Sequence, residues 1–323
     1  MKILNYTEKF DGDILRLWNT AGARIGYAPQ TKAGLDALML RLPEFCPQHT
    51  FLLEKDGGIR GFVNGTSGDR LFRGGVRGYL SCVILEDEYN NLENTKALLD
   101  ALEASFRTAG KTEAAVTCFN PVRLPWIIPG TPGHQHNNMP GIAKDIPLYD
   151  CMLQLGYSEA GTEQAMYAPM TEFEIPAELS ETEKKLNASG RYVDYYREGE
   201  HTGLDEMVES LNNTMWSAEI PASGHSGMKL LVGLEGNTVT GFAGPVYPEE
   251  TGRGYFAGIA VGPKFRGRGY GKLLFYKLCR AERECGARYM SLFTGTDNPA
   301  RYIYAGAGFE ARRYFAIMIK ELK

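Results

Sequence analysis

The sequence predicts an α/β protein in which one mixed-sheet fold occurs twice in tandem. Short apolar runs typical of strands alternate with runs of helical periodicity, and much of the chain repeats at a constant spacing. Arg77–Leu85 and Arg253–Val261 are apolar runs that both begin Arg-Gly-Tyr, and residue 253 follows residue 77 by 176 positions. Gly110 and Gly286 have the same spacing, and each closes a helical pattern.

Each predicted element of the first copy has its own signal in the sequence. Asp11 can accept a hydrogen bond at the start of a helix, Pro43 stops a second helix, and Asp56-Gly57 is a turn typical of a hairpin. The expected elements are, in order, a strand at Lys2–Tyr6, helices at Asp11–Trp18 and Leu35–Leu42, a hairpin at Leu52–Gly65, the strand that ends at Leu85 and a helix closed by Gly110.

The first copy also carries an insertion. Gly156 and Gly308 are only 152 positions apart, so the first copy is longer by 24 residues, which we place within Asn120–Pro147. This segment is rich in proline and glycine and is predicted to be a loop. His134 and His136 could bind a metal, but no close carboxylate or cysteine completes a ligand set, so we predict no metal site.

The second copy repeats the pattern after a polar stretch. We predict domains at 1–170 and 190–323, joined by a linker at 171–189 that contains a proline. The expected elements are a strand at Arg191–Arg197, a helix at Leu204–Trp216, a loop at Glu219–His225, a hairpin at Leu231–Val246 that turns at Glu235-Gly236, a strand at Tyr255–Val261 and a helix closed by Gly286.

The composition is that of a globular cytoplasmic protein. A hydrophobic content of 43% with 23% charged residues fits a packed, water-soluble fold. No apolar run approaches the ~20 residues needed to cross a bilayer, and the N-terminus does not read as a signal peptide. The six cysteines form no C-x-x-C pair, which favours a reducing compartment. A net charge of −4 does not favour nucleic acid as a partner.

The segment Val261–Leu274 is the clearest chemical signal in the chain. It reads V-G-P-K-F-R-G-R-G-Y-G-K-L-L and joins a predicted strand to a predicted helix. Its alternating glycines let the main chain approach a ligand, because no side chains stand in the way. The start of a helix offers unpaired N–H groups and a partial positive charge, to which Arg266, Arg268 and Lys272 add full charges. The segment is therefore predicted to bind a phosphate or pyrophosphate.

Three kinds of phosphate-binding loop compete for this segment. A Walker A loop requires Ser or Thr after Gly271-Lys272, but Leu273 follows, so no hydroxyl is left for magnesium. A dinucleotide fingerprint requires a third glycine where Lys272 stands when the count starts at Gly267. The third pattern, R-x-x-G-x-G, is met by Arg266, Gly269 and Gly271. It resembles the coenzyme A pyrophosphate loop of the GNAT superfamily of N-acetyltransferases.

A second segment supports this resemblance. GNAT proteins usually show N-x-x-A-x-x-x-Y-x-x-x-G-F here, and Ala300, Tyr304 and Gly308-Phe309 fit that pattern. Asp297 stands at the asparagine position and Asn298 follows it, so which of the two contacts the coenzyme stays open, and we favour Asn298. The resemblance implies that two strands diverge in this region to admit the pantetheine arm, and that Tyr304 is the general acid.

The resemblance implies an N-acetyltransferase that moves an acetyl group directly from acetyl-CoA to a small-molecule or peptide amine. The second domain, 190–323, would perform the chemistry, with Tyr304 as its catalytic residue. The residues expected to bind acetyl-CoA are Ile259, Ala260, Val261, Arg266, Gly267, Arg268, Gly269, Tyr270, Gly271, Lys272 and Asn298. The identity of the acceptor and the oligomeric state do not follow from the sequence.

The first domain, 1–170, is predicted to keep the fold and to have lost the coenzyme site. At the common spacing, Asn90 replaces Arg266 and Glu93 replaces Gly269, so a carboxylate and extra side chains stand where pyrophosphate would bind. Met152 stands in place of Tyr304. The pattern of a degenerate first half and an intact second half resembles mycothiol synthase-like tandem GNAT proteins.

The acceptor side is less well defined by the sequence. Trp216 could face the acceptor, although a core position suits it better, and Glu219 and His225 are possible bases that could equally be surface residues. No base is therefore assigned. Two other functions remain open, namely a non-catalytic sensor that binds acetyl-CoA and a nucleotide-binding protein with an unusual phosphate loop.

Overall fold

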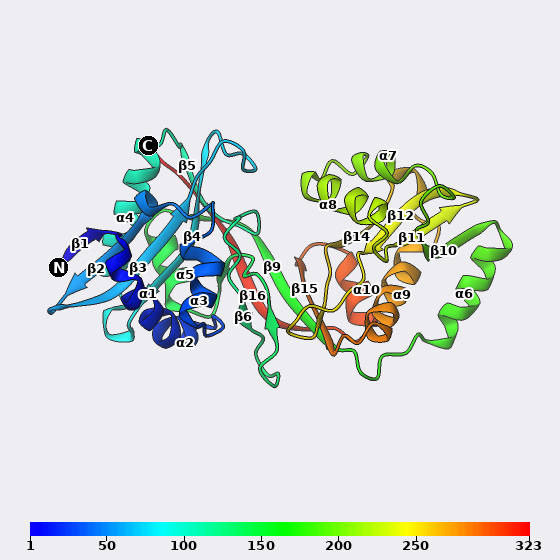
Figure 1. The fold of residues 1–323 in the computed structure, drawn as a ribbon, viewed down its shortest axis with the longest axis horizontal. Helices are drawn as coiled ribbons and strands as arrows, with labels where there is room; N and C mark the ends of the chain where they lie inside the picture. The colour runs from blue at the N-terminus through cyan, green and yellow to red at the C-terminus, as the bar shows by residue number, and fades with distance from the viewer. The chain divides into compact units, whose positions relative to one another are not determined.

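The computed structural model describes residues 1–323, and the chain divides into two compact units (Figure 1). Unit 1 contains Met1–Ala165 together with Arg312–Lys323, and unit 2 contains Met166–Ala311. None of the helices is long and apolar enough to span a membrane.

The limits of the units differ from the predicted domains at two places. The segment Arg312–Lys323, which we predicted in the second domain, lies in unit 1, because it pairs with a strand of that unit. The segment 171–189, which we predicted as a linker, contains helix α6, Ala177–Ala188. Leu179 and Leu186 of α6 are buried in the main core of unit 2, so this helix is part of the unit.

Unit 1 is built around one mixed sheet. Its helices and strands are β1 Lys2–Asn5, α1 Asp11–Leu17, α2 Ala23–Ile25, α3 Lys32–Leu35, β2 Thr50–Lys55, β3 Gly58–Thr66, β4 Arg77–Leu85, α4 Leu92–Thr108, β5 Glu113–Val116, β6 Trp126–Ile127, β7 Gln135–His136, β8 Ile142–Ala143, α5 Pro147–Gln154, β9 Ser158–Pro169 and β16 Glu310–Glu321. The strand order is β1-β2-β3-β4-β5-β16-β9, and β8 also pairs with β16. The strands β6 and β7 form a separate pair within the predicted insertion.

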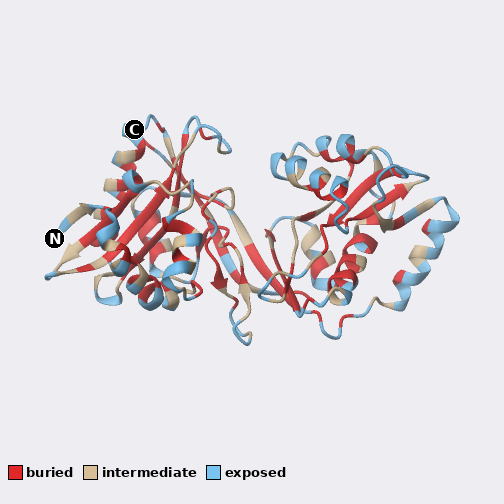
Figure 2. Ribbon diagram, viewed as in Figure 1, coloured by how far each residue is buried: buried red, intermediate tan, exposed pale blue.

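Two cores lie on opposite faces of this sheet. Along β2, Leu53 packs with α4, whereas Leu52 packs with α1, as expected where successive side chains alternate. Figure 2 shows the central strands as the most continuously buried part of the unit. The predicted hairpin at 52–65 is confirmed as β2 and β3.

Unit 2 contains two smaller sheets. Its helices and strands are α6 Ala177–Ala188, β10 Arg191–Tyr195, α7 Leu204–Glu209, α8 Thr214–His225, β11 Leu231–Glu235, β12 Thr238–Gly244, β13 Arg253–Gly254, β14 Gly258–Val261, α9 Tyr270–Glu284, β15 Tyr289–Gly295 and α10 Ala300–Gly306. One sheet has the order β10-β11-β12-β14, and the other contains β13 and β15 beside the end of β9. The helices α9 and α10 lie on one face of the first sheet, and α7 and α8 lie on the other (Figure 1).

Two predicted elements of unit 2 were wrong in detail. The run at 255–261 is interrupted, because β13 ends at Gly254 and β14 begins only at Gly258. The segment at 219–225, predicted as a loop, belongs to helix α8. Asn213 caps α8 by accepting the N–H groups of Met215 and Trp216, and the helix includes Pro221.

Candidate functional site

The glycine-rich loop leaves a row of main-chain donors free. Residues 266–269 follow a turn of 3₁₀ helix at Pro263–Phe265 and precede α9, and their N–H groups donate no main-chain hydrogen bond. Gly267 and Gly269 have φ angles of +75° and +89°, which glycine adopts without strain. The first N–H groups of α9 add to this row, since they lack partners one turn earlier. Such a cradle of donors suits a diphosphate.

Core packing holds this loop in place. The Tyr270 side chain is buried and its hydroxyl donates to the carbonyl of Leu234 at 2.7 Å, so only its main chain can face a ligand. Leu273 and Leu274 lie in the main core of unit 2. Arg268 donates to Glu235 at 2.5 Å and to the carbonyl of Lys264 at 3.1 Å. The Arg268 guanidinium therefore holds the loop against the turn of the β11–β12 hairpin, while its main-chain N–H belongs to the row of free donors.

Two cations remain exposed beside the cradle. The Arg266 guanidinium makes one weak contact, 3.3 Å from its Nε to the carbonyl oxygen of Val261. The Lys272 ammonium lies 5.5 Å from the ring centroid of Tyr276. Neither side chain has a carboxylate partner, so both can turn toward an anion bound at the loop.

The strands next to the loop diverge, as we predicted. At Arg253 and Gly254, β13 pairs with β15. A few residues later, β14 pairs only with β12, and its other edge faces no strand. Alternate main-chain groups of Ile259–Val261 are therefore free to bind an extended ligand that enters between β14 and β15.

Tyr304 lies on the α9 side of this opening. It is 5% exposed, and its ring is 4.6 Å from that of Phe275 and 6.3 Å from that of Phe256. Burial raises the pKa of its hydroxyl to about 12. The hydroxyl makes no hydrogen bond within the protein and is not fully enclosed, so its proton is available to a ligand.

Asn298 begins the segment that leads to Tyr304. Its side-chain oxygen accepts the N–H of Ala300 at 3.0 Å, which fixes the start of α10. The amide NH₂ group stays exposed and can donate to a ligand, whereas the carboxylate of Asp297 can only accept. This difference favours Asn298 over Asp297 beside a phosphate.

The opposite face of the opening carries a second cluster. The indole Nε1 of Trp216 donates to the carbonyl of Ala257 at 3.0 Å. One turn later on α8, the carboxylate of Glu219 accepts the hydroxyl of Tyr255 at 2.6 Å. The Tyr255 ring stacks on that of Tyr247, with centroids 4.7 Å apart. Sequence reasoning named Trp216 and Glu219 but gave neither tyrosine a role, because Tyr255 was interpreted only as the start of a strand and Tyr247 as the residue after a hairpin.

His225, the other possible base, is held by two carboxylates. Its Nδ1 lies 2.7 Å from Glu198 and its Nε2 lies 2.9 Å from Asp205. These hydrogen bonds raise the pKa of the imidazole, which favours its charged form. Both ring nitrogens are engaged, so His225 ties the end of α8 to its neighbours and has no free site for a substrate proton.

The sequence analysis also missed a buried acid, Glu282 of α9. It is fully buried, and its Oε1 accepts the N–H of Tyr247 at 3.2 Å. Burial raises the pKa of its carboxyl to about 9, so it is neutral at pH 7. A comparison of the two copies could have revealed it. The equivalent position in unit 1, 176 residues earlier, is the apolar residue Phe106, which indicates a buried site for Glu282. Both side chains pack directly against the equivalent glycine. A Cβ added at Gly254 would lie 2.9 Å from Glu282, and one added at Gly78 would lie 2.5 Å from Phe106.

These features agree with a comparison to known protein families. Residues 184–309 match the family described as Acetyltransferase (GNAT) family, and the match includes the loop, the diverging strands and Tyr304. Residues 184–309 form a GNAT domain. No curated protein matches the sequence.

Solved structures show that the whole chain has the fold of tandem GNAT proteins. A GCN5-related N-acetyltransferase from Sphaerobacter thermophilus is 14% identical with a TM-score of 0.65, and the match covers 100% of this chain and 96% of that one. A tandem GNAT protein from the clavulanic acid biosynthesis pathway is 14% identical with a TM-score of 0.60, covering 100% and 98%.

A third structure is much longer than this chain. It contains the GCN5-related glucosamine N-acetyltransferase region of a fungal multi-domain GH3 β-N-acetylglucosaminidase, with 14% identity and a TM-score of 0.71. The match covers 98% of this chain but spans only 38% of that protein. At these identities the three structures establish the fold alone.

Unit 1 differs from the GNAT domain at the position of the loop. After β4, the N–H groups of Tyr89, Asn90 and Asn91 donate to main-chain carbonyls. Asn91 then caps α4 by accepting the N–H of Asn94 at 3.0 Å. The N–H groups of residues 89–91 are thus satisfied internally here, and Glu93 is exposed at the position of Gly269.

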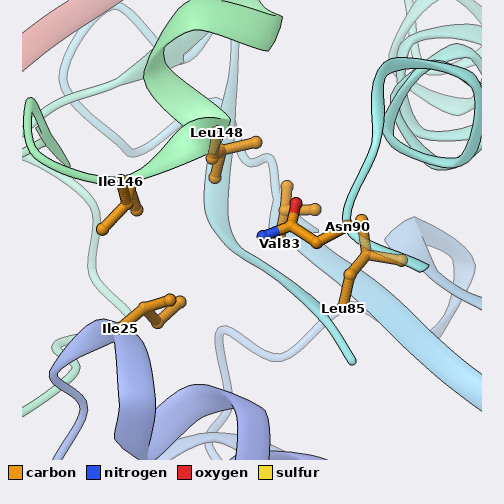
Figure 3. Close-up of a pocket in the computed structure, with 6 residues that line it drawn as sticks. All are labelled: Ile25, Val83, Leu85, Asn90, Ile146 and Leu148. Atoms are coloured by element: carbon orange, nitrogen blue, oxygen red, sulfur yellow. The ribbon is translucent and has the colours of Figure 1, made fainter. Parts of the chain in front are cut away.

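Aliphatic side chains narrow the opening beside β4 in unit 1. Figure 3 shows a small pocket whose lining side chains converge from β4, α2 and the start of α5. The lining residues are Ile25, Val83, Leu85, Asn90, Ile146 and Leu148. Met152, at the position of Tyr304, is fully buried and has no proton to donate.

The insertion of unit 1 is an ordered part of that unit. The indole of Trp126 is fully buried and donates to the carbonyl of Asn138 at 2.8 Å. The ring of His136 stacks on Trp126, with centroids 6.1 Å apart. No group of three or more His, Cys, Asp or Glu side chains that could hold a metal occurs in the structure.

Proposed function

We propose that the GNAT domain is an N-acetyltransferase that moves an acetyl group directly from acetyl-CoA to a small-molecule or peptide amine. The observation that carries this proposal is the row of free N–H donors at residues 266–269, followed by a helix start and flanked by two unpaired cations. A diphosphate satisfies such donors, and coenzyme A carries a diphosphate next to an extended arm.

The arm and the thioester would follow the edge of β14. The main-chain groups of Ile259–Val261 that face away from β12 would hold the arm in an extended form. Asn298 would donate from the far side of the opening. Placement of the thioester next to the amine supplies roughly 7–11 kcal/mol of the barrier reduction in favourable cases.

The reaction makes two demands on protons. An alkylammonium with a lysine-like pKa near 10.4 must lose a proton before it can attack, which costs roughly 4–5 kcal/mol at pH 7. The leaving thiolate must also be stabilised or protonated. Tyr304 would serve the second demand, because its high pKa keeps its hydroxyl protonated at neutral pH and its proton is not engaged elsewhere. General acid catalysis is typically worth ~10²–10⁴ in rate.

Unit 1 would have kept the fold and lost the coenzyme site. The N–H groups of residues 89–91 in its equivalent loop are engaged internally, aliphatic side chains narrow its opening, and Met152 replaces the acid. One acetyl-CoA per chain is therefore expected. A non-catalytic sensor would have the same stoichiometry, and the test below separates the two functions.

Tyr304→Phe tests the acid role. We expect kcat to fall by at least tenfold, while the Kd for coenzyme A changes less than twofold, because the ring keeps its contacts with Phe275 and Phe256. Free thiol release with a panel of amines measures kcat, and calorimetry measures the Kd. Equal losses in both quantities contradict the acid role. No thiol release by the wild-type chain with any amine, despite tight binding, favours the sensor.

A further inference from the structure

The carboxylate of Glu219 lies where the strands of the GNAT domain part, on the face opposite Tyr304. Ring contacts place Phe256 on the Tyr304 side, with its centroid 6.0 Å from that of Phe275. Tyr255, its neighbour, points to the α8 side and donates to Glu219. Successive residues of an extended segment face opposite sides, so the acid and the carboxylate flank the same opening from its two faces.

Helix α8 is anchored by contacts on both sides of Glu219. One turn before it, Trp216 donates to Ala257, and the indole lies so close that a Cβ at Gly258 would be 2.6 Å from its Nε1. At the end of α8, His225 bridges Glu198 and Asp205. A carboxylate anchored in this way keeps its position without a ligand, as a catalytic group must.

The charges around Glu219 favour a cation. Tyr255 donates to Glu219, and the charged groups that act on the neighbouring hydroxyl of Tyr247 are Glu219 itself, the pair Glu249 and Arg253, and the carboxyl of Glu282 on α9. Arg253 donates to both carboxylate oxygens of Glu249, at 2.7 and 2.9 Å, so these charges cancel. Glu282 is neutral at pH 7. Glu219 has no cation partner within the protein and accepts only the hydroxyl of Tyr255, so its carboxylate is available to an ammonium.

The stacked rings add a second attraction. Tyr247 and Tyr255 are both half-buried, and their rings are nearly parallel, at 15°. The face of a tyrosine ring attracts an ammonium by ~0.5–1 kcal/mol at exposed sites and more when water is excluded. A carboxylate beside aromatic rings thus suits an alkylammonium better than a neutral or anionic acceptor.

We propose that Glu219 is the base of the reaction and that the acceptor is a primary alkylamine, which binds as its ammonium against Glu219 and the Tyr247–Tyr255 pair. This inference rests on the proposed acetyltransferase function. Tyr255 is a positioning residue, since it acts by holding the carboxylate of Glu219.

The proposed step balances in atoms and charge. Glu219 accepts one proton from the ammonium, and the freed nitrogen lone pair forms a bond to the carbonyl carbon of acetyl-CoA. The carbon–sulfur bond then breaks, and the sulfur takes up the proton of Tyr304 as it leaves. The acetylated nitrogen then loses its second proton, which passes through water to the oxygen of Tyr304. The products are the N-acetyl amine and free coenzyme A, and water removes the proton held by Glu219.

Glu219→Gln, compared with the wild-type full-length chain, tests this assignment. An alkylamine needs the base at pH 7, whereas an arylamine is already neutral, so we expect at least a hundredfold loss of kcat/KM with n-butylamine, benzylamine and glycinamide and less than a threefold loss with aniline. The variant's rate with n-butylamine should rise tenfold per pH unit between pH 7 and 9, as the free amine becomes more abundant. Glu250→Gln, an exposed carboxylate on a neighbouring segment, is the matched control and should match the wild type.

The outcomes separate this inference from the function on which it rests. Calorimetry of coenzyme A binding confirms that Glu219→Gln is folded and loaded. If the wild-type chain acetylates the alkylamines and Glu219→Gln matches it at pH 7, or loses equal activity with aniline, the base assignment is wrong while the acetyltransferase stands. If the wild-type chain acetylates aniline but none of the alkylamines, the acceptor class is wrong. If it acetylates no amine, both proposals fail.

Discussion

Phe106 of unit 1 and Glu282 of unit 2 occupy one of the buried positions at which the two copies of the fold differ. Phe106 of unit 1 fills the space under Gly78 with a ring, whereas Glu282 of unit 2 fills the space under Gly254 with a carboxyl group. The Oε2 atom of Glu282 has no hydrogen-bond partner, and a buried unpartnered carboxyl destabilises a fold. Glu282 also holds Tyr247, which stacks on the tyrosine that positions Glu219. Glu282 thus lowers the stability of the fold next to the proposed acceptor site.

The raised pKa of Glu282 predicts a pH-dependent stability of the GNAT domain. The unfolded carboxyl ionises near pH 4.5 and the folded one near pH 9, so the folded state holds more protons between these values. The free energy of unfolding should therefore fall as pH rises through this window, by up to about 1.4 kcal/mol per pH unit. Glu282→Gln should remove this dependence and stabilise the domain at pH 8.

The pH dependence of this stability can be measured by hydrogen exchange of peptides from α9, followed between pH 5 and 8 and corrected for intrinsic rates. Glu284→Gln is a matched control, because Glu284 lies on the same helix but is exposed. A pH dependence in Glu282→Gln as steep as that of the wild type would show that another group is responsible.

Some single residues were predictable and others were not. The spacing of Tyr304 from Ala300 and Gly308 fits a family pattern, which singled it out, and it lies beside the opening; its role as the acid stays a proposal. The sequence assigned Arg268 to the coenzyme without showing that its guanidinium binds Glu235, which leaves only its main chain for a ligand. The sequence shows that Arg268 is charged, but only the folded chain brings Glu235 of the β11–β12 turn next to it.

The loop and helix α9 form one functional element at the next scale. A strand ended by Gly262-Pro263, a glycine-rich loop and a periodic helix were all visible in the sequence, because each depends on local preferences. The two-residue hairpin turns were visible for the same reason. The break at residues 255–257 and the extent of α8 were not, since both depend on the contact between Trp216 and Ala257.

Gly271→Glu tests whether the glycine-rich loop and the start of α9 bind the coenzyme. A Cβ at Gly271 has room, with Ile303 at 3.7 Å, so α9 should form normally. The new carboxylate would stand in the first turn, beside the proposed diphosphate, and like charges repel at short range. We expect calorimetry to show at least a hundredfold weaker binding of coenzyme A, with an unchanged circular dichroism spectrum.

Gly12→Glu provides the matched control for this substitution. Gly12 is also the second residue of a helix, α1 of unit 1, and a Cβ there meets no atom within 4 Å. This variant should bind coenzyme A like the wild type. Wild-type affinity in Gly271→Glu would mean that the coenzyme binds elsewhere.

At the scale of the whole molecule, the chain does not divide at one point along the sequence. The last strand, β16, pairs with β5 of unit 1, with Met318 opposite Val116. Ala316, Met318 and Leu322 are buried in a core of that unit. Sequence reasoning recovered the repeat and the two-copy architecture, but pairing across some 200 residues leaves no local signal.

Removal of residues 312–323 should therefore damage unit 1 and spare unit 2. The truncation deletes a paired strand and the ion pair between Lys320 and Glu103, which is 2% exposed and keeps only the longer contact of 3.5 Å to Arg107. Breaking a buried ion pair costs up to ~3–5 kcal/mol. Hydrogen exchange should accelerate by at least a hundredfold in β5, while peptides from α9 change less than threefold. Faster exchange in α9 than in β5 would contradict the division into units.

The most direct test of the account is a crystal structure of the full-length chain grown with coenzyme A. The account predicts one coenzyme per chain, with its diphosphate within hydrogen-bond distance of the N–H groups of residues 267–271 and its arm between β14 and β15. A coenzyme bound beside Asn90 and Glu93 of unit 1, or an empty loop at 267–271 with the ligand bound elsewhere, would contradict the central claim.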